Sequence, residues 1–382
     1  MAEPLKNFFD RALVERIAAS IVTVMPAFDR RAFVRDAAAG LDELELLARS
    51  NRIAEALAKH LPQPFDEAAA VITASLGAKH AKDELVGAGM GPFFYLPHTM
   101  FVAARGLDHF ERAMDLQYEI TQRFTCEFSI RPFIDRHPDA TLARLARWAR
   151  DPSPHVRRLV SEGTRQRLPW ASRVRLLDEH PERALELVEL LRDDPSAMVR
   201  RSVANHLNDL TKSRPELVYA VCERWLTDAD AQRRALVAYA LRSAIKKGDR
   251  RALALVGRGD APKVSVESVA FEPARVRIGE SLRVRVELKS SAPKASEPQS
   301  LEVDLVVHFV KQRGTSAKVF KLSRVSLAPR GEVTLEKSIS LAVHTTRTPN
   351  VGRHVVELQV NGVKRPLGHF DVAPARVAKK RA

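Results

Sequence analysis

The sequence predicts a multidomain α-then-β fold, an all-α solenoid of HEAT-like repeats followed by an immunoglobulin-like β-sandwich. Three observations carry this prediction: a segment repeated after 43 residues, apolar residues at helical spacing as far as residue 256, and apolar–polar alternation beyond it. We therefore expect a helical domain over residues 1–256, a sandwich over 257–375 and a basic tail over 376–382.

The repeated segment begins with Asp-Pro-Ser and occurs at residues 151–162 and again at 194–205. A His-Pro pair precedes each copy at the same offset, at residues 137–138 and 180–181, so a whole unit is duplicated. A period of about 40–47 residues is typical of HEAT repeats, which stack into a curved solenoid. Asp, Ser and Pro suit the cap and first turn of a helix, and a degenerate third copy starts at Asp228.

Strand signals replace helical ones after residue 257. Apolar and polar residues alternate in the stretches 264–266, 282–288, 301–305, 333–339 and 355–360. The last stretch meets Asn361-Gly362, which is a strong two-residue hairpin signal. About seven short strands predict a β-sandwich of immunoglobulin-like class, although the Cys–Trp–Cys pattern of antibody domains is absent from the sequence.

Basic residues are in excess and unevenly distributed. The chain has 62 Lys and Arg against 47 Asp and Glu, a net charge of +15, and residues 260–382 hold 22 against 12. An excess of this size favours a polyanionic partner, most commonly DNA or RNA. The alternative is a solvated, arginine-rich surface without such a partner.

The two cysteines, Cys126 and Cys222, are too few for a disulfide framework or a cysteine-based zinc site. They are typical of a reducing compartment. No signal-type apolar core follows the N-terminus, and no run reaches the roughly 18 apolar residues that span a bilayer. We expect a cytoplasmic monomer that does not associate with membranes.

The first copy of the repeat places an acidic residue among arginines. On a helical wheel started at Val156, residues 159, 160 and 163 form a buried stripe, and Arg158, Glu162 and Arg165 fall on the opposite arc. In the sister helix the same three angles carry Arg201, Asn205 and Asn208. Arginine forks on such a face suit phosphate, because they bind it bidentately.

A structural interpretation of these residues is also open. The arginines could pair with Asp151, Asp193 and Asp194 in adjacent turns, as in many solenoids. A single glutamate among arginines is most often a salt-bridge partner, so Glu162 could be one.

Two neighbouring segments add aromatic and charged residues. Residues 121–133 combine phenylalanines with Glu127, Arg123 and Arg131. Residues 164–170 follow Glu162 directly and end in one of three tryptophans, Trp170. Trp170 could form part of a functional surface or, alternatively, of the core.

At these residues the chain resembles the AlkC branch of the HEAT-like repeat DNA glycosylases, relatives of AlkD. The matching strings lie at residues 124–133, 157–165, 168–170 and 200–209. The resemblance covers nearly the whole chain, including the immunoglobulin-like domain that a subset of AlkC proteins carries. Cys126 stands where a small polar residue is more usual.

The resemblance implies an enzyme that excises alkylated bases from duplex DNA, chiefly 3-methyladenine, with 3-methylcytosine for the AlkC branch. It implies Glu162 as the catalytic carboxylate, Glu127 and Asp209 as acidic neighbours and Trp170 as an aromatic wall. The DNA-binding residues would be Arg123, Arg131, Arg157, Arg158, Arg165, Arg200 and Arg201. No cofactor and no metal are expected, and the nucleotide is not expected to turn fully out of the duplex.

These residue types suit the chemistry. An N3-alkylated base already carries positive charge, so it leaves without a general acid, and the sugar develops oxocarbenium character. A carboxylate stabilises that cation, and a water bound to it can attack the sugar. An indole face adds cation–π attraction. 3-Methyladenine, 3-methylcytosine and 1-methyladenine all fit this chemistry.

Two other functions remain open from the sequence. A non-catalytic HEAT scaffold would bind nucleic acid or an acidic protein and would be indifferent to loss of Glu162. A nuclease would use Glu127, Glu162 and Asp209 as metal ligands and would be sensitive to EDTA. For the sandwich, which has no catalytic constellation, we expect a role in clamping duplex DNA opposite the solenoid.

Overall fold

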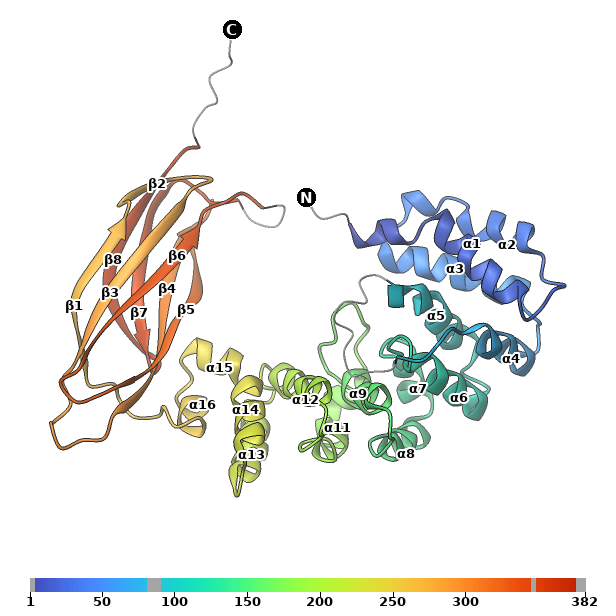
Figure 1. The fold of residues 1–382 in the computed structure, drawn as a ribbon, viewed down its shortest axis with the longest axis horizontal. Coiled ribbons are helices and arrows are strands. Elements are labelled where there is room, and N and C mark those ends of the chain that lie inside the picture. The colour runs from blue at the N-terminus through green and yellow to red at the C-terminus, as the bar shows by residue number, and fades with distance from the viewer. Residues whose placement is uncertain (1–3, 81–90, 345–347, 376–382) are drawn as a thin grey trace, which may run out of the picture. The chain divides into compact units, whose positions relative to one another are not determined.

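The computed structural model describes residues 4–80, 91–344 and 348–375. Helices occupy the chain as far as Leu255 and strands follow from Val264, which confirms the predicted all-α solenoid followed by a β-sandwich (Figure 1). The chain divides into two compact units, Met1–Ser213 and Arg214–Ala382. The predicted basic tail, 376–382, lies outside the described residues.

The first unit is helical. Its elements are η1 (Leu5–Phe8), α1 (Arg11–Val22), α2 (Arg30–Ala38), η2 (Leu41–Glu43), α3 (Leu46–His60), α4 (Phe65–Ser75), η3 (Gly91–Tyr95), α5 (Leu96–Arg105), α6 (Phe110–Thr121), α7 (Ile130–Arg136), α8 (Pro138–Trp148), α9 (Pro154–Gly163), α10 (Arg175–Glu179), α11 (Pro181–Glu189) and α12 (Ala197–Leu210).

The duplicated segment forms two helix pairs, α8–α9 and α11–α12, which lie next to each other in Figure 1. Each pair opens with proline in the first turn, and each linking turn closes on an aspartate. Asp151 Oδ1 accepts from the backbone N–H of Ser153, and Asp194 Oδ1 accepts from that of Ser196, both at 2.8 Å. The serines occupy the N-cap positions of α9 and α12 without a side-chain capping bond, so the aspartates organise these turns.

The buried stripe predicted for α9 is present, but the opposite arc is not solvated. Val156, Leu159 and Val160 are fully buried, and a Cβ on Gly163 would lie 2.5 Å from the Ile130 side chain, so this close approach requires glycine. Glu162, placed on the outer arc, is only 4% exposed. Because α9 ends at Gly163, Arg165 lies beyond the helix, and the wheel position predicted for it is wrong.

The second unit combines helices with a sandwich. Its elements are α13 (Pro215–Leu226), α14 (Ala231–Ala240), α15 (Arg242–Lys247), α16 (Arg250–Leu255), β1 (Val264–Glu272), β2 (Arg275–Arg277), β3 (Ser281–Ser290), β4 (Gln299–Val310), β5 (Thr315–Leu327), β6 (Glu332–Ser340), β7 (Gly352–Val360) and β8 (Val363–Ala373).

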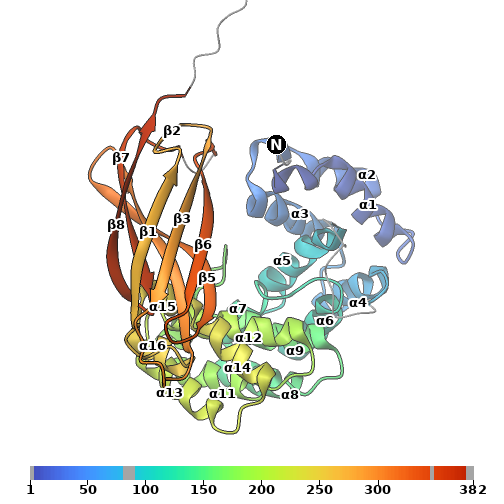
Figure 2. The ribbon, with the colours of Figure 1, turned by 60° about the vertical axis from the view of Figure 1, so that its left-hand side comes forward.

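Two sheets share one apolar core. A three-stranded sheet has the order β1-β3-β6, and a five-stranded sheet has the order β2-β8-β7-β4-β5 (Figure 2). The inward residues of both sheets, including Val284, Leu305 and Leu358, are fully buried in this core. All five alternating stretches lie in strands, and Asn361 and Gly362, with φ of 45° and 79°, form the predicted turn between β7 and β8. Strand β5 was not predicted, because most of its residues are exposed or only half-buried and its apolar alternation is interrupted at Ser323 and Arg324.

Helices α15 and α16 pack against the sandwich. Gln359 Nε2 donates to the backbone carbonyl of Lys246 at 3.2 Å, and a Cβ on Gly362 would lie 2.5 Å from the carbonyl oxygen of Gly248. Helices α13–α16 therefore group with the strands in the second unit. The boundary expected from the sequence lay between residues 256 and 257, where the secondary structure changes. Within the described residues, no helix combines the length and hydropathy needed to cross a membrane.

Candidate functional site

Three of the predicted site residues come together at the ends of α9 and α12. Arg165 Nη1 donates to Glu162 Oε2 at 2.8 Å, and its Nε and Nη2 donate to Asp209 Oδ2 at 2.9 and 2.7 Å. Glu162 and Asp209 are each 4% exposed. One guanidinium therefore links two buried carboxylates that belong to successive repeats.

Arg158 extends the cluster to Glu127. Its Nη2 lies 3.5 Å from Glu162 Oε1 and 3.5 Å from Glu127 Oε2. The Thr125 hydroxyl donates to Glu127 Oε2 at 3.0 Å. Lys212 was not predicted, yet its Nζ lies 3.0 Å from Asp209 Oδ1. The signal for Lys212 was its spacing of three residues from Asp209, which brings the two side chains together at the end of a helix.

Burial and pairing oppose each other in this cluster. Burial raises the pKa of Glu127, the Arg158 guanidinium works against that rise, and the nearby Glu162 carboxylate adds to it. For Arg165, burial lowers the pKa, but the Glu162 and Asp209 carboxylates outweigh it and the pKa is raised. The cluster holds three carboxylates and three cationic side chains, so its charges balance.

Buried residues hold the ends of the cluster in place. Arg131, 1% exposed, donates to the backbone carbonyls of Ser172, Gly163 and Arg165 at 2.8, 2.9 and 2.9 Å. Burial lowers the pKa of Arg131 to about 10. His206, also 1% exposed, was not predicted. Its Nδ1–H donates to the Ser161 carbonyl at 3.1 Å, because a carbonyl can only accept.

Four of the predicted DNA-binding arginines bind protein groups in the free protein. Arg157 donates to both oxygens of Asp194 at 2.6 and 3.0 Å, as the structural interpretation anticipated. Arg200 donates to the backbone carbonyls of residues 194 and 195, and Arg123 to those of residues 77 and 119. With Arg131, these side chains hold turns and loops together in the free protein, and their predicted contacts with DNA stay a prediction. Arg201 lies exposed on α12.

Trp170 is 57% exposed, so the alternative that it belongs to the core is wrong. It lies in the turn between α9 and α10 with a φ of 65°. A positive φ is uncommon for a bulky residue, and strained backbone of this kind is often found at functional sites. The turn therefore presents a large aromatic surface to solvent eight residues after Glu162.

The carboxylates do not assemble as a metal-ligand set. Over residues 4–80, 91–344 and 348–375, no group of three or more His, Cys, Asp or Glu side chains is arranged to hold a metal ion. The oxygens of Glu127, Glu162 and Asp209 face arginine or lysine nitrogens instead.

Comparison with known proteins relates the helical and the sandwich parts of this chain to two family models. Residues 121–247 match the model of the DNA alkylation repair enzyme family, and residues 265–374 match the model of the C-terminal Ig-like domain of the uncharacterised protein YhaZ. The uncharacterized protein YhaZ of Bacillus subtilis (strain 168) is 30% identical over 371 residues, which cover 96% of this chain and 99% of that protein.

A solved structure matches over nearly the whole chain. The Pseudomonas fluorescens alkylpurine DNA glycosylase AlkC, bound to DNA containing an abasic site analog, is 35% identical with a TM-score of 0.88, covering 97% of this chain and 100% of that one. The helical repeats and the C-terminal Ig-like domain together define the class of protein. The chain belongs to the AlkC-type DNA alkylation repair family.

Proposed function

We propose that this protein is a DNA glycosylase that hydrolyses the N-glycosidic bond of cationic alkylated bases in duplex DNA, 3-methyladenine and also 3-methylcytosine. One observation carries the proposal: the buried Glu162–Arg165–Asp209 cluster lies in a chain that matches an alkylpurine DNA glycosylase from end to end. That relative is bound to DNA with an abasic site analog, which is why we propose DNA as the partner here.

Glu162 is our candidate for the catalytic carboxylate. As the bond to a cationic base lengthens, the base leaves as a neutral molecule and the sugar takes up the positive charge at C1′. A carboxylate facing C1′ stabilises that charge, and a water it orients adds its oxygen to C1′ and gives up a proton. A neutral base remains a poor leaving group, so selectivity arises from the lesion and the nucleotide need not turn fully out of the duplex.

Arg158 and Arg165 couple DNA binding to exposure of this carboxylate. Both guanidiniums form ion pairs with Glu162 in the free protein. The Arg158 side chain is 20% exposed and that of Arg165 is 13% exposed. A guanidinium binds phosphate at least as well as carboxylate, because its fork matches both. Phosphates of a bound duplex would draw these arginines off Glu162, and the exposed Arg201 would add a further phosphate contact.

Asp209, Glu127 and Trp170 complete the proposed site. Asp209 keeps Arg165 within reach when that arginine leaves Glu162, since it accepts two of the three bonds. Glu127 holds Arg158 from the other side at 3.5 Å. The exposed indole of Trp170 offers its face to the cationic base or sugar, an attraction of about 0.5–2 kcal/mol.

The sandwich contributes DNA affinity in this proposal. Residues 260–382 carry 22 Lys and Arg against 12 Asp and Glu, so this part of the chain supplies ten of the fifteen net positive charges. Charge of this kind acts on the phosphate backbone without reading sequence.

Base release from methylated duplex DNA in EDTA, compared between wild type and Glu162→Gln, tests the function. We expect wild type to release N3-methylated base and the variant to be about 10²–10³-fold slower, as for loss of one group that stabilises transition-state charge. Duplex binding, measured separately, should persist. Glu182→Gln, at an exposed glutamate of α11, is the matched control and should release base like wild type.

The other outcomes point to other functions. Duplex binding without base release by wild type would contradict the proposal and favour the non-catalytic scaffold. Strand cleavage that EDTA abolishes would favour a metal-dependent nuclease. Base release unaffected by Glu162→Gln would remove this glutamate from the mechanism.

A further inference from the structure

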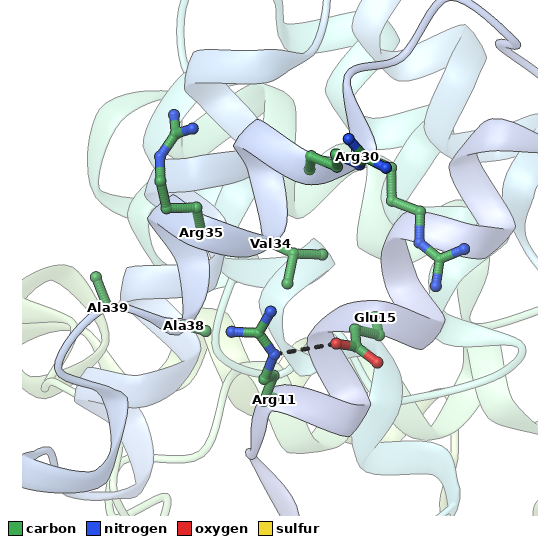
Figure 3. A pocket seen from close by; sticks show the side chains of 8 residues that line it. Arg11, Glu15, Arg30, Val34, Arg35, Ala38 and Ala39 are labelled. Carbon is green, nitrogen blue, oxygen red and sulfur yellow. Dashed lines mark hydrogen bonds and ion pairs between the residues drawn. The ribbon is translucent and has the colours of Figure 1, made fainter.

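An arginine-lined pocket lies near the N-terminus of the first unit, whereas α9 and α12 lie near its C-terminal end in the sequence. It has a volume of about 520 Å³ and lies between α1 and α2 (Figure 3). Its lining residues are Arg11, Glu15, Arg30, Arg31, Val34, Arg35, Ala38 and Ala39. Four arginines against one glutamate make it strongly positive.

Two of these arginines have acidic partners in the free protein. Arg11 Nε donates to Glu15 Oε1 at 3.1 Å, and Arg35 Nε donates to Asp36 Oδ1 at 3.1 Å. The side chains of Arg11 and Arg35 are 68% and 69% exposed, so water screens both pairs. Exposed pairs of this kind are worth about 0–1 kcal/mol, and a bound anion can replace them.

The other two arginines, Arg30 and Arg31, are exposed at the start of α2. Within the described residues, neither guanidinium makes a hydrogen bond or ion pair with a protein group. Asp29, the nearest acidic residue in sequence, instead accepts from the backbone N–H of Ala32 at 2.9 Å and caps the helix. Both arginines therefore bring free donors to the pocket.

The shape suits a phosphate that is part of a longer chain. In Figure 3, Arg11, Arg30 and Arg35 lie around Val34, and the small side chains of Ala38 and Ala39 leave room beside them. Arginine forks supply the donors that phosphate oxygens accept, and an apolar floor suits the sugar next to a phosphate.

We propose that this pocket binds backbone phosphates of the duplex that flanks the lesion, a second DNA contact remote from Glu162. The inference rests on the proposed function only in taking DNA as the polyanion. Helices pack in the succession α2, α3, α5, α6 and α9. Four steps of about 8–10 Å each put the pocket up to about 40 Å from the cluster, about 12 base pairs of duplex.

The test is the salt dependence of binding to an undamaged 30-base-pair duplex by the full-length double variant Arg30→Ala, Arg31→Ala. Each lost phosphate contact lowers the slope of log K against log[salt] by about 0.9, so two contacts lower it by about 1.8. Between 50 and 200 mM salt, wild type should then lose about tenfold more affinity than the variant.

The matched control removes two exposed arginines elsewhere in the same unit, Arg136→Ala with Arg147→Ala on α7 and α8, and should leave the slope near that of wild type. An unchanged slope in the pocket variant, or an equal change in the control, overturns the proposal.

A calorimetric titration with inorganic pyrophosphate separates the two sources of phosphate. Loss of pyrophosphate binding with normal duplex binding would assign the pocket to a small phosphorylated ligand and overturn the proposal. Because these measurements use undamaged DNA, they are independent of base release. Failure of the glycosylase proposal and failure of this inference are therefore distinguishable.

Discussion

At the scale of single residues, the proposed catalytic carboxylate, Glu162, is buried and paired in the free protein. It is 4% exposed and two guanidiniums lie within 3.5 Å of its oxygens. A buried charge is tolerated only when it is paired, and removing one partner leaves the other uncompensated. In the proposed mechanism, the arginines that pair with Glu162 in the free protein exchange this carboxylate for DNA phosphates before it acts.

Trp170 should separate activity from stability. Trp170→Gly removes the aromatic face, so we expect base release to fall by about 2–30-fold, the equivalent of the 0.5–2 kcal/mol of a cation–π contact. Because glycine adopts a φ of 65° readily and the indole is 57% exposed, the thermal midpoint should stay level or rise. Single-turnover kinetics and thermal unfolding check both parts, with Trp170→Phe as the conservative control. A clear loss of stability would show that the indole packs after all.

His206 should make stability depend on pH. Burial lowers its pKa to about 4, against about 6.5 in the unfolded chain. Below pH 6.5 the unfolded chain takes up a proton that the folded protein refuses until about pH 4, so stability falls across this window by up to about 3 kcal/mol. His98, with a pKa of about 4 through burial, adds in the same direction.

Thermal midpoints at pH 7.5 and 5 measure this effect. His206→Asn keeps a donor for the Ser161 carbonyl without a titrating ring, so it should lose less stability between the two pH values than wild type. His180→Asn, at an exposed position before α11, is the control and should follow wild type. Identical pH dependence in His206→Asn would contradict the assignment.

At the scale of elements, arginine–carboxylate pairs join successive repeats. Arg157 follows the first Asp-Pro-Ser turn and bonds the aspartate of the second, 37 residues later. Arg165 reaches Asp209, 44 residues later, in the same way. The first pair links α9, and the second the turn that follows it, to the next repeat, so the stacking of repeats holds these residues as well as their own helices do.

Asp194→Ala tests the first of these links. Asp194 is 3% and Arg157 13% exposed at the side chain, so the substitution leaves a buried guanidinium without its carboxylate. We expect a loss of about 3–5 kcal/mol in unfolding free energy. Asp139→Ala breaks an exposed pair with Arg183, where the aspartate is 87% exposed, and should cost under about 1 kcal/mol. Denaturant titration of the full chain measures both, and equal small losses would mean that the link between the repeats contributes little.

At the scale of the whole molecule, most of the net positive charge and the proposed site residues lie in different parts of the chain. The proposed site residues all lie in Met1–Ser213, whereas residues 260–382 hold ten of the fifteen net positive charges. Helices α13–α16 group with the sandwich, since α15 and the following turn contact the loop between β7 and β8.

Removal of the sandwich should weaken DNA binding more than it slows base release from DNA that is already bound. We expect deletion of residues 260–382 to lower duplex affinity and to reduce the salt slope, because fewer phosphates are neutralised. Base release at saturating enzyme should change little. A second deletion of 214–382 follows the compact-unit boundary and controls for the helix face that the first deletion uncovers. Unchanged affinity and slope in both proteins would remove the sandwich from DNA binding.

The sequence by itself determined the repeat unit, the change from helix to strand and the hairpin at Asn361, because periodicity and turn chemistry act over a few residues. Only the tertiary structure decided which partner each arginine binds. Arg157 and Arg200 bind groups of the linking turns, whereas Arg158 and Arg165 form ion pairs with Glu162. It also decided that Trp170 is exposed and that β5 pairs with β4. These outcomes depend on how segments far apart in the chain stack, and the register between repeats brings residues 37 to 44 positions apart into contact. Local patterns carry no information about that register.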